Sequence, residues 1–312
     1  MDFIQTFREG QQVKGVYLCK TKQRLQAKNG KDYFSLNLQD KTGIVDGKVW
    51  EVNSPGIEEF DAPAYVFIEA LVTVFNSKNQ LNIRRIRKAK EGDYDPNDYM
   101  PVSLYDIETM YKELVSKINL VEEPHYKRLL EMIFIEDEKF IARFKKHSAA
   151  KTVHHSFVGG LLEHTLSVSR LCVHFASAYP VLNRDLLLTA GMCHDIGKTR
   201  ELSAFPMNEY TDEGQFLGHI IIGVQMLQER IDQIDDFPEQ LRMQLLHCIL
   251  AHHGEYEFGS PKKPELVEAL ALNIIDNADA KMELFAQILS TGGNDWLGFN
   301  KLLDANVRRT LV

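Results

Sequence analysis

Histidine is distributed unevenly along this chain of 312 residues. All eleven histidines lie between residues 125 and 253. His164 follows Phe157 and Leu161 at spacings that place all three residues on one helical face, so its side chain is predicted to point inward. A lone histidine on such a face is more often a core residue than a ligand. The interpretation therefore depends on whether the pattern recurs.

The pattern recurs on two further predicted helices. His194 continues the apolar face of Leu187 and Ala190, and Asp195 is beside it. Asp276 follows the apolar stretch 269–275 and lies on its inner face. Burial of an ionised carboxylate is costly unless the group is paired or bound to a metal. Inward polar residues on three separate helices therefore predict a shared partner, most economically a divalent metal.

The nature and number of the ligands indicate which metals suit the site. Imidazole and carboxylate ligands without cysteine suit Mn, Fe, Zn, Ni or Co and disfavour a structural zinc site. His219 and the adjacent pair His252-His253 are further candidates, and helical spacing does not decide which of the pair faces inward. The set is too large for one ion with open positions, so we predict a two-metal site bridged by Asp195. The predicted metal ligands are His164, His194, Asp195, His219, His252, His253 and Asp276.

Such a site suits hydrolysis of phosphate esters. A water shared by two cations loses its proton near neutral pH, and the cations polarise phosphoryl oxygens. Asp195 and Lys198 are the predicted catalytic residues: Lys198 could neutralise developing charge, or it could be a solvated lysine at a helix end. Glu163, beside His164, is either an acceptor for an imidazole N–H or an exposed helix residue.

The candidate ligands lie in the acidic part of the chain, which has 21 basic and 33 acidic residues beyond residue 92. Segment 93–105 contains two prolines and three aspartates and is predicted to be a linker. Residues 106–312 have helical periodicity and are predicted to form an all-helical domain. Ser103, with Glu108 nearby, is the expected start of its first helix. Other helices are predicted over 136–146, 157–178, 183–196, 215–232, 238–253 and 264–289.

Residues 1–92 have the opposite charge, with 15 lysines and arginines against 11 aspartates and glutamates. Hydrophobic alternation predicts five short strands here, and Asn29-Gly30 is a strong hairpin signal. Five strands in this length suit a small Greek-key barrel of the OB type, with an SH3-like barrel as the structural alternative. The expected architecture is thus multidomain, a five-stranded β-barrel followed by an all-α domain.

A basic barrel could bind single-stranded nucleic acid through base stacking on aromatic rings and phosphate contacts with cations. Each candidate also has a structural alternative, as part of a charged edge strand or, for Trp50, of the barrel core. The predicted nucleic-acid-binding residues are Tyr33, Lys48, Trp50, Lys20, Lys22, Arg84 and Arg85.

The order of the inward residues carries a resemblance. His164, then His194-Asp195 within His-Asp-Ile-Gly-Lys, and finally Asp276 resemble the H…HD…D signature of the HD phosphohydrolase superfamily. His219 and His252-His253 resemble the additional ligands of its two-metal branch. The resemblance covers roughly residues 125–290. It implies an all-helical fold around divalent metal.

An OB-like barrel joined to such a domain resembles the YhaM-type 3′→5′ exoribonucleases over nearly the whole chain. Segments 159–165 and 251–254 reinforce the similarity. The resemblance implies manganese-supported removal of nucleotides from the 3′ ends of single-stranded RNA, with single-stranded DNA as a second candidate substrate. An oligomer is compatible with the sequence.

Two rival functions belong to different classes. A nucleotide or cyclic-dinucleotide phosphohydrolase is suggested by His252-His253-Gly254-Glu255 through Gly259-Ser260-Pro261, which resembles the HD-GYP pattern. Ser260 stands where that family has tyrosine, and a free-nucleotide enzyme would not need a basic barrel. A binding module with a structural metal is the non-enzyme rival, which the near-complete ligand set disfavours.

Composition indicates the cellular compartment. No apolar stretch approaches the length of a membrane span, and the N-terminus lacks the features of a signal peptide. The cysteines are not spaced as a metal or redox motif and lie in apolar segments, so all are predicted to be buried thiols in a reducing cytoplasm. The four are Cys19, Cys172, Cys193 and Cys248.

Overall fold

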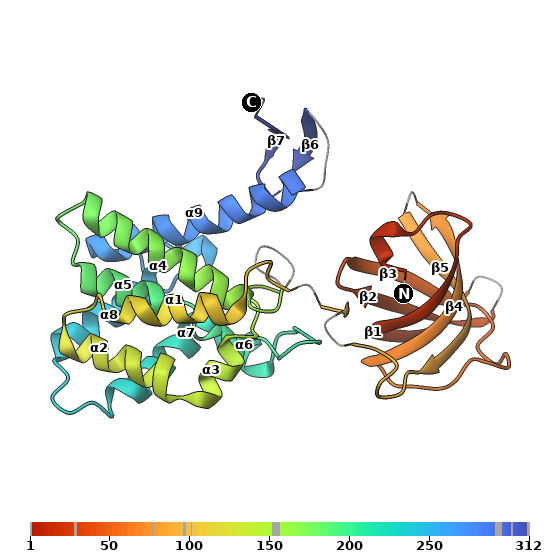
Figure 1. The fold of residues 1–312 in the computed structure, drawn as a ribbon, viewed down its shortest axis with the longest axis horizontal. Coiled ribbons are helices and arrows are strands. Elements are labelled where there is room, and N and C mark those ends of the chain that lie inside the picture. The colour runs from red at the N-terminus through yellow and green to blue at the C-terminus, as the bar shows by residue number, and fades with distance from the viewer. Residues whose placement is uncertain are drawn as a thin grey trace. The chain divides into compact units, whose positions relative to one another are not determined.

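The computed structural model describes residues 2–27, 30–76, 78–95, 98–100, 102–151, 157–290, 295–300 and 302–310. They form two compact units. The first comprises Met1–Val102 with Phe205–Met207, and the second comprises Ser103–Ala204 with Asn208–Val312. The first unit contains the barrel strands and the second contains the helices (Figure 1).

The first unit is a closed five-stranded barrel with the strand order β1-β2-β3-β5-β4. β3 and β5 pair in parallel, and the other neighbours pair antiparallel. The predicted OB-type barrel is therefore confirmed. Its strands are β1 (Gln12–Gln26), β2 (Asp32–Asp40), β3 (Gly43–Val49), β4 (Ala64–Phe75) and β5 (Lys78–Lys88), and a short 3-10 helix, η1 (Ile4–Thr6), precedes them.

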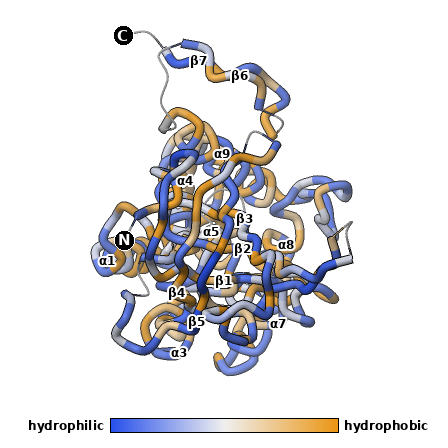
Figure 2. The backbone as a smooth tube through the Cα atoms, turned by 90° about the vertical axis from the view of Figure 1, so that its right-hand side faces the viewer, coloured by the Kyte–Doolittle hydropathy of each residue, from blue (hydrophilic) through white to orange (hydrophobic). Residues whose placement is uncertain are grey.

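Alternation of side chains explains the barrel core. Val66, Ile68, Ala70 and Val72 of β4 are buried, whereas the residues between them are only partly covered. Successive residues of a strand point to opposite faces, so one face of β4 fills the barrel. In Figure 2, hydropathy changes repeatedly along the elements, because each element contributes one face to a core.

The chain beyond β5 continues to pack on the barrel. The Tyr94 ring stacks on Tyr65 with 4.0 Å between the ring centroids, and Tyr99 is 2% exposed beside Val16 and Leu18. Part of segment 93–105, predicted to be a linker, therefore covers an outer face of the barrel. The sequence did not predict this packing, because the acidic, proline-containing segment shows no hydrophobic periodicity.

The second unit is built mainly of helices that surround one large apolar core. Within the described residues, none of the helices is both long and apolar enough to cross a membrane. Its elements are α1 (Ile107–Ile118), α2 (Pro124–Glu131), the π-helix η3 (Met132–Glu136), α3 (Glu138–Phe144), α4 (Gly160–Ala178), α5 (Arg184–Cys193), α6 (Lys198–Glu201), α7 (Asp212–Ile231), α8 (Glu239–Ala251), the 3-10 helix η4 (Tyr256–Phe258), α9 (Val267–Ser290), β6 (Trp296–Asn300) and β7 (Ala305–Arg308).

Helix ends follow from capping side chains. Asp106 caps α1 by accepting from the backbone N–H of Thr109 at 2.8 Å, so the predicted start at Ser103 is corrected by three residues. Ser103 instead donates its hydroxyl to Glu163 at 2.5 Å. All four cysteines are buried free thiols, as predicted.

The C-terminal end differs from the all-helical prediction for 106–312. β6 and β7 pair antiparallel in a two-stranded sheet that follows α9 (Figure 1). Asp304 has a positive φ of 48°, which suits a tight turn, and Asp tolerates this conformation better than most residues. The two strands are too short to show a convincing alternation in the sequence.

Candidate metal centre

The structure brings all seven predicted ligands together from five segments of the helical unit. His164 lies on α4, His219 on α7 and Asp276 on α9. His194 and His252 are the residues at which α5 and α8 end, and Asp195 and His253 follow them. Two helix ends and three helix faces thus converge on one place.

Asp195 lies at the centre of this arrangement and is 2% exposed. Its Oδ2 atom is 3.3 Å from Nε2 of His164 and 3.3 Å from Nε2 of His194. Its Oδ1 atom is 3.6 Å from Nε2 of His219 and 3.9 Å from Nε2 of His252. The two oxygens of one carboxylate therefore face two different sets of imidazoles.

The other ligands form two groups around Asp195. In the first group, Nε2 of His164 is 3.0 Å from Nε2 of His194 and 3.2 Å from Oδ1 of Asp276. In the second group, His219, His252 and His253 each offer a ring nitrogen within 4.8 Å of the others. Each group has the size and the donor atoms of a metal site.

The orientation of the imidazoles favours metal binding. Nδ1 of His194, His252 and His253 lies 2.9, 2.6 and 2.9 Å from a backbone carbonyl oxygen. A carbonyl only accepts, so Nδ1 donates a proton in each ring, and the neutral form of the ring has its lone pair on Nε2. Nδ1 of His164 and of His219 meets a carboxylate instead, from Asp279 at 2.7 Å and Glu201 at 3.0 Å. All five rings are thus held through Nδ1.

Several of the ligand atoms have no hydrogen-bond partner among the described residues. Oδ1 of Asp195, Nε2 of His219 and Nε2 of His252 are buried and unpaired in this sense. Buried polar atoms without partners are costly and rare, and their concentration at one point needs an explanation. A bound cation would satisfy them, so the residues present fit a divalent metal.

The two groups differ in their proton chemistry. Burial alone would lower the pKa of His194, but the charge of Asp195 and hydrogen bonds to Asp195 and Asp276 raise it to about 9. In the second group, burial and the neighbouring imidazoles hold the pKa of His252 well below its usual range. The first group therefore exchanges protons for a cation, whereas His252 is neutral and ready to bind.

Close backbone approach positions the second group. A Cβ atom on Gly197 would lie 2.0 Å from the carbonyl oxygen of His219, so only glycine allows this approach to α7. Gly218 has φ 71° and ψ 158° and interrupts the helical geometry of α7 immediately before His219. The glycine of the His-Asp-Ile-Gly-Lys motif is thus explained by packing.

Lys198 lies inside the site. It is the first residue of α6, beyond the end of the predicted helix 183–196. Its Nζ atom is 2.6 Å from Oδ2 of Asp195. Burial alone would lower the pKa of Lys198, but the charges of Asp195 and Asp276 raise it, so the side chain stays an ammonium. The same lysine helps hold the pKa of Asp195 well below its usual range, against the opposing effect of burial.

Comparison with known proteins agrees with this geometry. A sequence model of the HD domain family matches residues 161–281, which contain every candidate ligand. The 3′-5′ exoribonuclease YhaM of Geobacillus sp. (strain WCH70) is 36% identical over 286 residues, which cover 91% of this chain and 86% of the relative. YhaM of Bacillus subtilis (strain 168) is 34% identical over 281 residues, covering 90% and 88%. The chain belongs to the YhaM family.

Two residues that hold candidate ligands in this YhaM-family chain were not found from the sequence. Asp279 accepts from Nδ1 of His164, and Glu201 accepts from Nδ1 of His219. Asp279 lies three residues after Asp276 on the same helix, and that spacing was the available signal. No signal in the sequence pointed to Glu201, because a turn separates it from His194. Glu163, considered for such a role, accepts from Ser103.

The predicted aromatic residues of the barrel meet each other. The rings of Tyr33 and Trp50 are 4.7 Å apart between centroids, and Trp50 is 45% exposed. Trp50 is therefore not part of the barrel core. Lys48 pairs with Asp46 at 2.9 Å and lies 5.9 Å from the Tyr33 ring centroid. The three predicted residues thus share one outer face.

The predicted cations of the barrel do not all share this face. Lys22 pairs in register with buried Leu36, and its Nζ atom lies over the rings of Phe34 and Phe60 at 4.4 and 4.5 Å. It also pairs with Glu59 at 2.6 Å, which leaves its side chain 9% exposed. Lys20 lies where the register of β1 shifts, whereas Arg84 and Arg85 of β5 are exposed.

Proposed function

We propose that this chain is a metal-dependent 3′→5′ exoribonuclease that releases mononucleotides from single-stranded RNA in the cytoplasm. The observation that carries the proposal is the central carboxylate of Asp195, which faces two imidazole groups with its two oxygens. The relatives named above are 3′-5′ exoribonucleases, which supports the same activity here.

The site would hold two divalent ions, preferably Mn, with Fe, Co, Ni or Zn as alternatives. His164, His194 and Asp276 would hold one, His219, His252 and His253 the other, and Asp195 would be shared. When bound, the ions supply Lewis-acid polarisation of a phosphoryl oxygen and activation of water. The imidazoles are already fixed through Nδ1, so the ligands need little rearrangement.

Asp195 and Lys198 would have different tasks in hydrolysis. Asp195 is ionised because Lys198 and His194 oppose the effect of burial on its pKa, so it keeps its negative charge for ligand binding. The Lys198 ammonium is 2.6 Å from Asp195, so it would supply a fixed positive charge beside a phosphate bound at this site. Preorganised charge of this kind stabilises charge that develops in the transition state.

The barrel would hold the single strand. Tyr33 and Trp50 offer adjacent aromatic rings, one of them substantially exposed, on which unpaired bases can stack. Exposed Arg84 and Arg85 would contribute phosphate contacts. Base stacking does not require a 2′-hydroxyl, so single-stranded DNA is the second expected substrate.

The nucleotide and cyclic-dinucleotide alternatives gain no support from the structure. Ser260, at the position where the HD-GYP pattern has tyrosine, is buried, and its hydroxyl lies within hydrogen-bond distance of the backbone carbonyl oxygens of Leu250 and Lys262, at 3.0 and 2.7 Å. The residue therefore has a structural role in the loop that follows His253.

The test is hydrolysis of 5′-labelled single-stranded RNA that contains a stable hairpin near its middle. We expect stepwise shortening from the 3′ end, arrest at the hairpin, and loss of activity after chelation with recovery on addition of Mn. A circular RNA of the same sequence is the control and should remain intact. Internal cleavage of the circle, or turnover of free nucleotides without shortening of RNA, would overturn the proposal.

A further inference from the structure

The two ligand groups around Asp195 are not equivalent. The first group contains the carboxylate of Asp276 together with His164 and His194, whereas the second contains three imidazoles. Apart from shared Asp195, the first group is therefore the harder and more anionic donor set. Two such sites should differ in affinity for the same ion.

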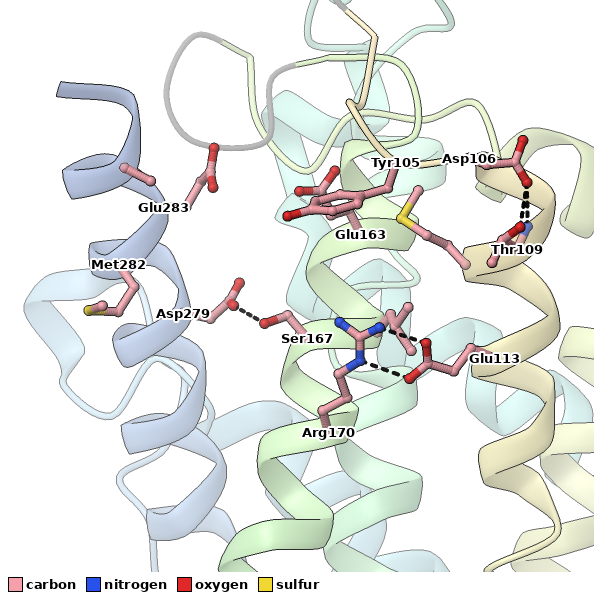
Figure 3. Close-up of a pocket in the computed structure, with 13 residues that line it drawn as sticks. Tyr105, Asp106, Thr109, Glu113, Glu163, Ser167, Arg170, Asp279, Met282 and Glu283 are labelled. Carbon is pink, nitrogen blue, oxygen red and sulfur yellow. Dashed lines mark hydrogen bonds and ion pairs between the residues drawn. The ribbon is translucent and has the colours of Figure 1, made fainter. Parts of the chain in front are cut away.

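Each group nevertheless contains one histidine that is held by a carboxylate rather than by a backbone carbonyl. In the first group, Oδ2 of Asp279 accepts from Nδ1 of His164 at 2.7 Å. The other oxygen of Asp279 accepts from the Ser167 hydroxyl, and Figure 3 shows this contact between α9 and α4. Asp279 is buried, and each of its two oxygens has a hydrogen-bond partner, so the position of the carboxylate is fixed.

Glu201 has the corresponding position in the second group. One of its oxygens, Oε1, accepts from both Nδ1 and the backbone N–H of His219, each at 3.0 Å. Glu201 is 9% exposed, so these two contacts hold its side chain against His219 inside the unit. His194, His252 and His253 have only neutral carbonyl acceptors at Nδ1.

A carboxylate behind a histidine fixes the tautomer and makes Nε2 a stronger donor to a metal. We propose that Asp279 and Glu201 are matched positioning residues, one for each of two unlike metal sites, so that each site can be weakened without the other. The inference rests on the proposed two-metal function. Ser167 assists Asp279 and should have the smaller effect.

The experiment measures Mn²⁺ binding to the full chain by calorimetry and by metal content after equilibrium dialysis, without RNA. The variants are Asp279→Asn and Glu201→Gln, which keep the shape and remove the charge. The wild type should bind two ions, and each variant should lose affinity for one ion by about 10- to 100-fold and retain the other. The double variant should bind neither tightly.

Control carboxylates lie on α9, which carries Asp279, and on α7, which carries the His219 that Glu201 contacts. Glu283, one turn after Asp279 on α9, accepts from Gln287 at 3.0 Å, and Glu229 is exposed on α7. Glu283→Gln and Glu229→Gln should bind both ions as the wild type does. Asp279→Glu keeps the carboxylate and should recover part of the lost affinity. Unfolding midpoints in chelator should be similar for all variants, which separates positioning from general destabilisation.

Three results would overturn the proposal. These are wild-type binding in both single variants, loss of both ions in either one, and a double variant that keeps one tight site. If the binding results are as expected but the RNA is not shortened, the positioning roles stand and the exoribonuclease proposal fails. The two failures are therefore distinguishable.

Discussion

The helical unit and the barrel both contain predicted functional residues, but they differ in how these residues are arranged. The other six predicted ligands of the helical unit gather around Asp195, whereas the predicted nucleic-acid contacts of the barrel lie on more than one face. Inward-facing residues of packed helices approach a common centre. Outward-facing residues of a closed barrel diverge, so a shared sequence pattern does not place them together.

Loss of the shared carboxylate should have the largest effect. Asp195→Ala should lower hydrolysis of single-stranded RNA by about 10³-fold or more, because it removes a donor from both metal groups at once. Far-UV circular dichroism should show the helical content largely unchanged. His194→Ala should be similarly inactive.

Asp212→Ala is a control for this variant, since Asp212 is exposed in the first turn of α7. It should retain activity near that of the wild type. If Asp195→Ala hydrolysed RNA at the wild-type rate, the residues gathered around Asp195 would not be the catalytic centre, and the contrast between the helical unit and the barrel would lose its basis.

Loss of the aromatic pair should have a smaller effect, on binding rather than on chemistry. Tyr33→Ala and Trp50→Ala should each weaken binding of long single-stranded RNA by roughly tenfold, since a stacked base contributes about 1–3 kcal/mol. Hydrolysis of very short oligomers should change little. Binding is measured by fluorescence anisotropy at fixed salt.

Phe75→Ala provides the comparison for the aromatic variants, because Phe75 is an exposed aromatic residue at the end of β4. Its affinity for RNA should match the wild type. If Phe75→Ala weakens binding as much as Trp50→Ala does, the Tyr33–Trp50 face has no special role.

Substitution of single cations of the barrel should have the smallest effect on RNA binding. Arg84→Ala should reduce the slope of log affinity against log salt by about one, as expected for one lost phosphate contact. Lys22→Ala should leave that slope unchanged, because Lys22 is covered by Phe34 and Phe60 and paired with Glu59. It should instead lower the free energy of unfolding by about 1 kcal/mol. Equal slopes for both variants would contradict the assignment.

Residues with a strong periodic signal were predicted well from the sequence. His164, His194 and Asp276 interrupt apolar helical faces, so their inward direction followed from spacing alone, and strand alternation predicted the barrel. The predicted helices 183–196 and 238–253 extend beyond α5 and α8, because His194 and His252 end these helices. Spacing cannot show where a helix stops when the final residue is itself buried.

Other features depend on contacts that are distant in the sequence. Asp279 reaches His164 from another helix, and Glu201 reaches His219 across the turn before α7. Lys22 lies on the inner side of β1 after the register shift between Cys19 and Thr21, and a local pattern does not reveal the aromatic rings that cover it. These contacts form only when the tertiary structure brings the elements together.

The central claim is that one carboxylate, Asp195, serves two metal groups. The most direct measurement is anomalous diffraction at the manganese edge from crystals of the full chain grown with Mn²⁺. We predict two peaks on either side of Asp195, one beside His164, His194 and Asp276 and the other beside His219, His252 and His253. A single peak, or two peaks of which only one lies within bonding distance of Asp195, would contradict the claim.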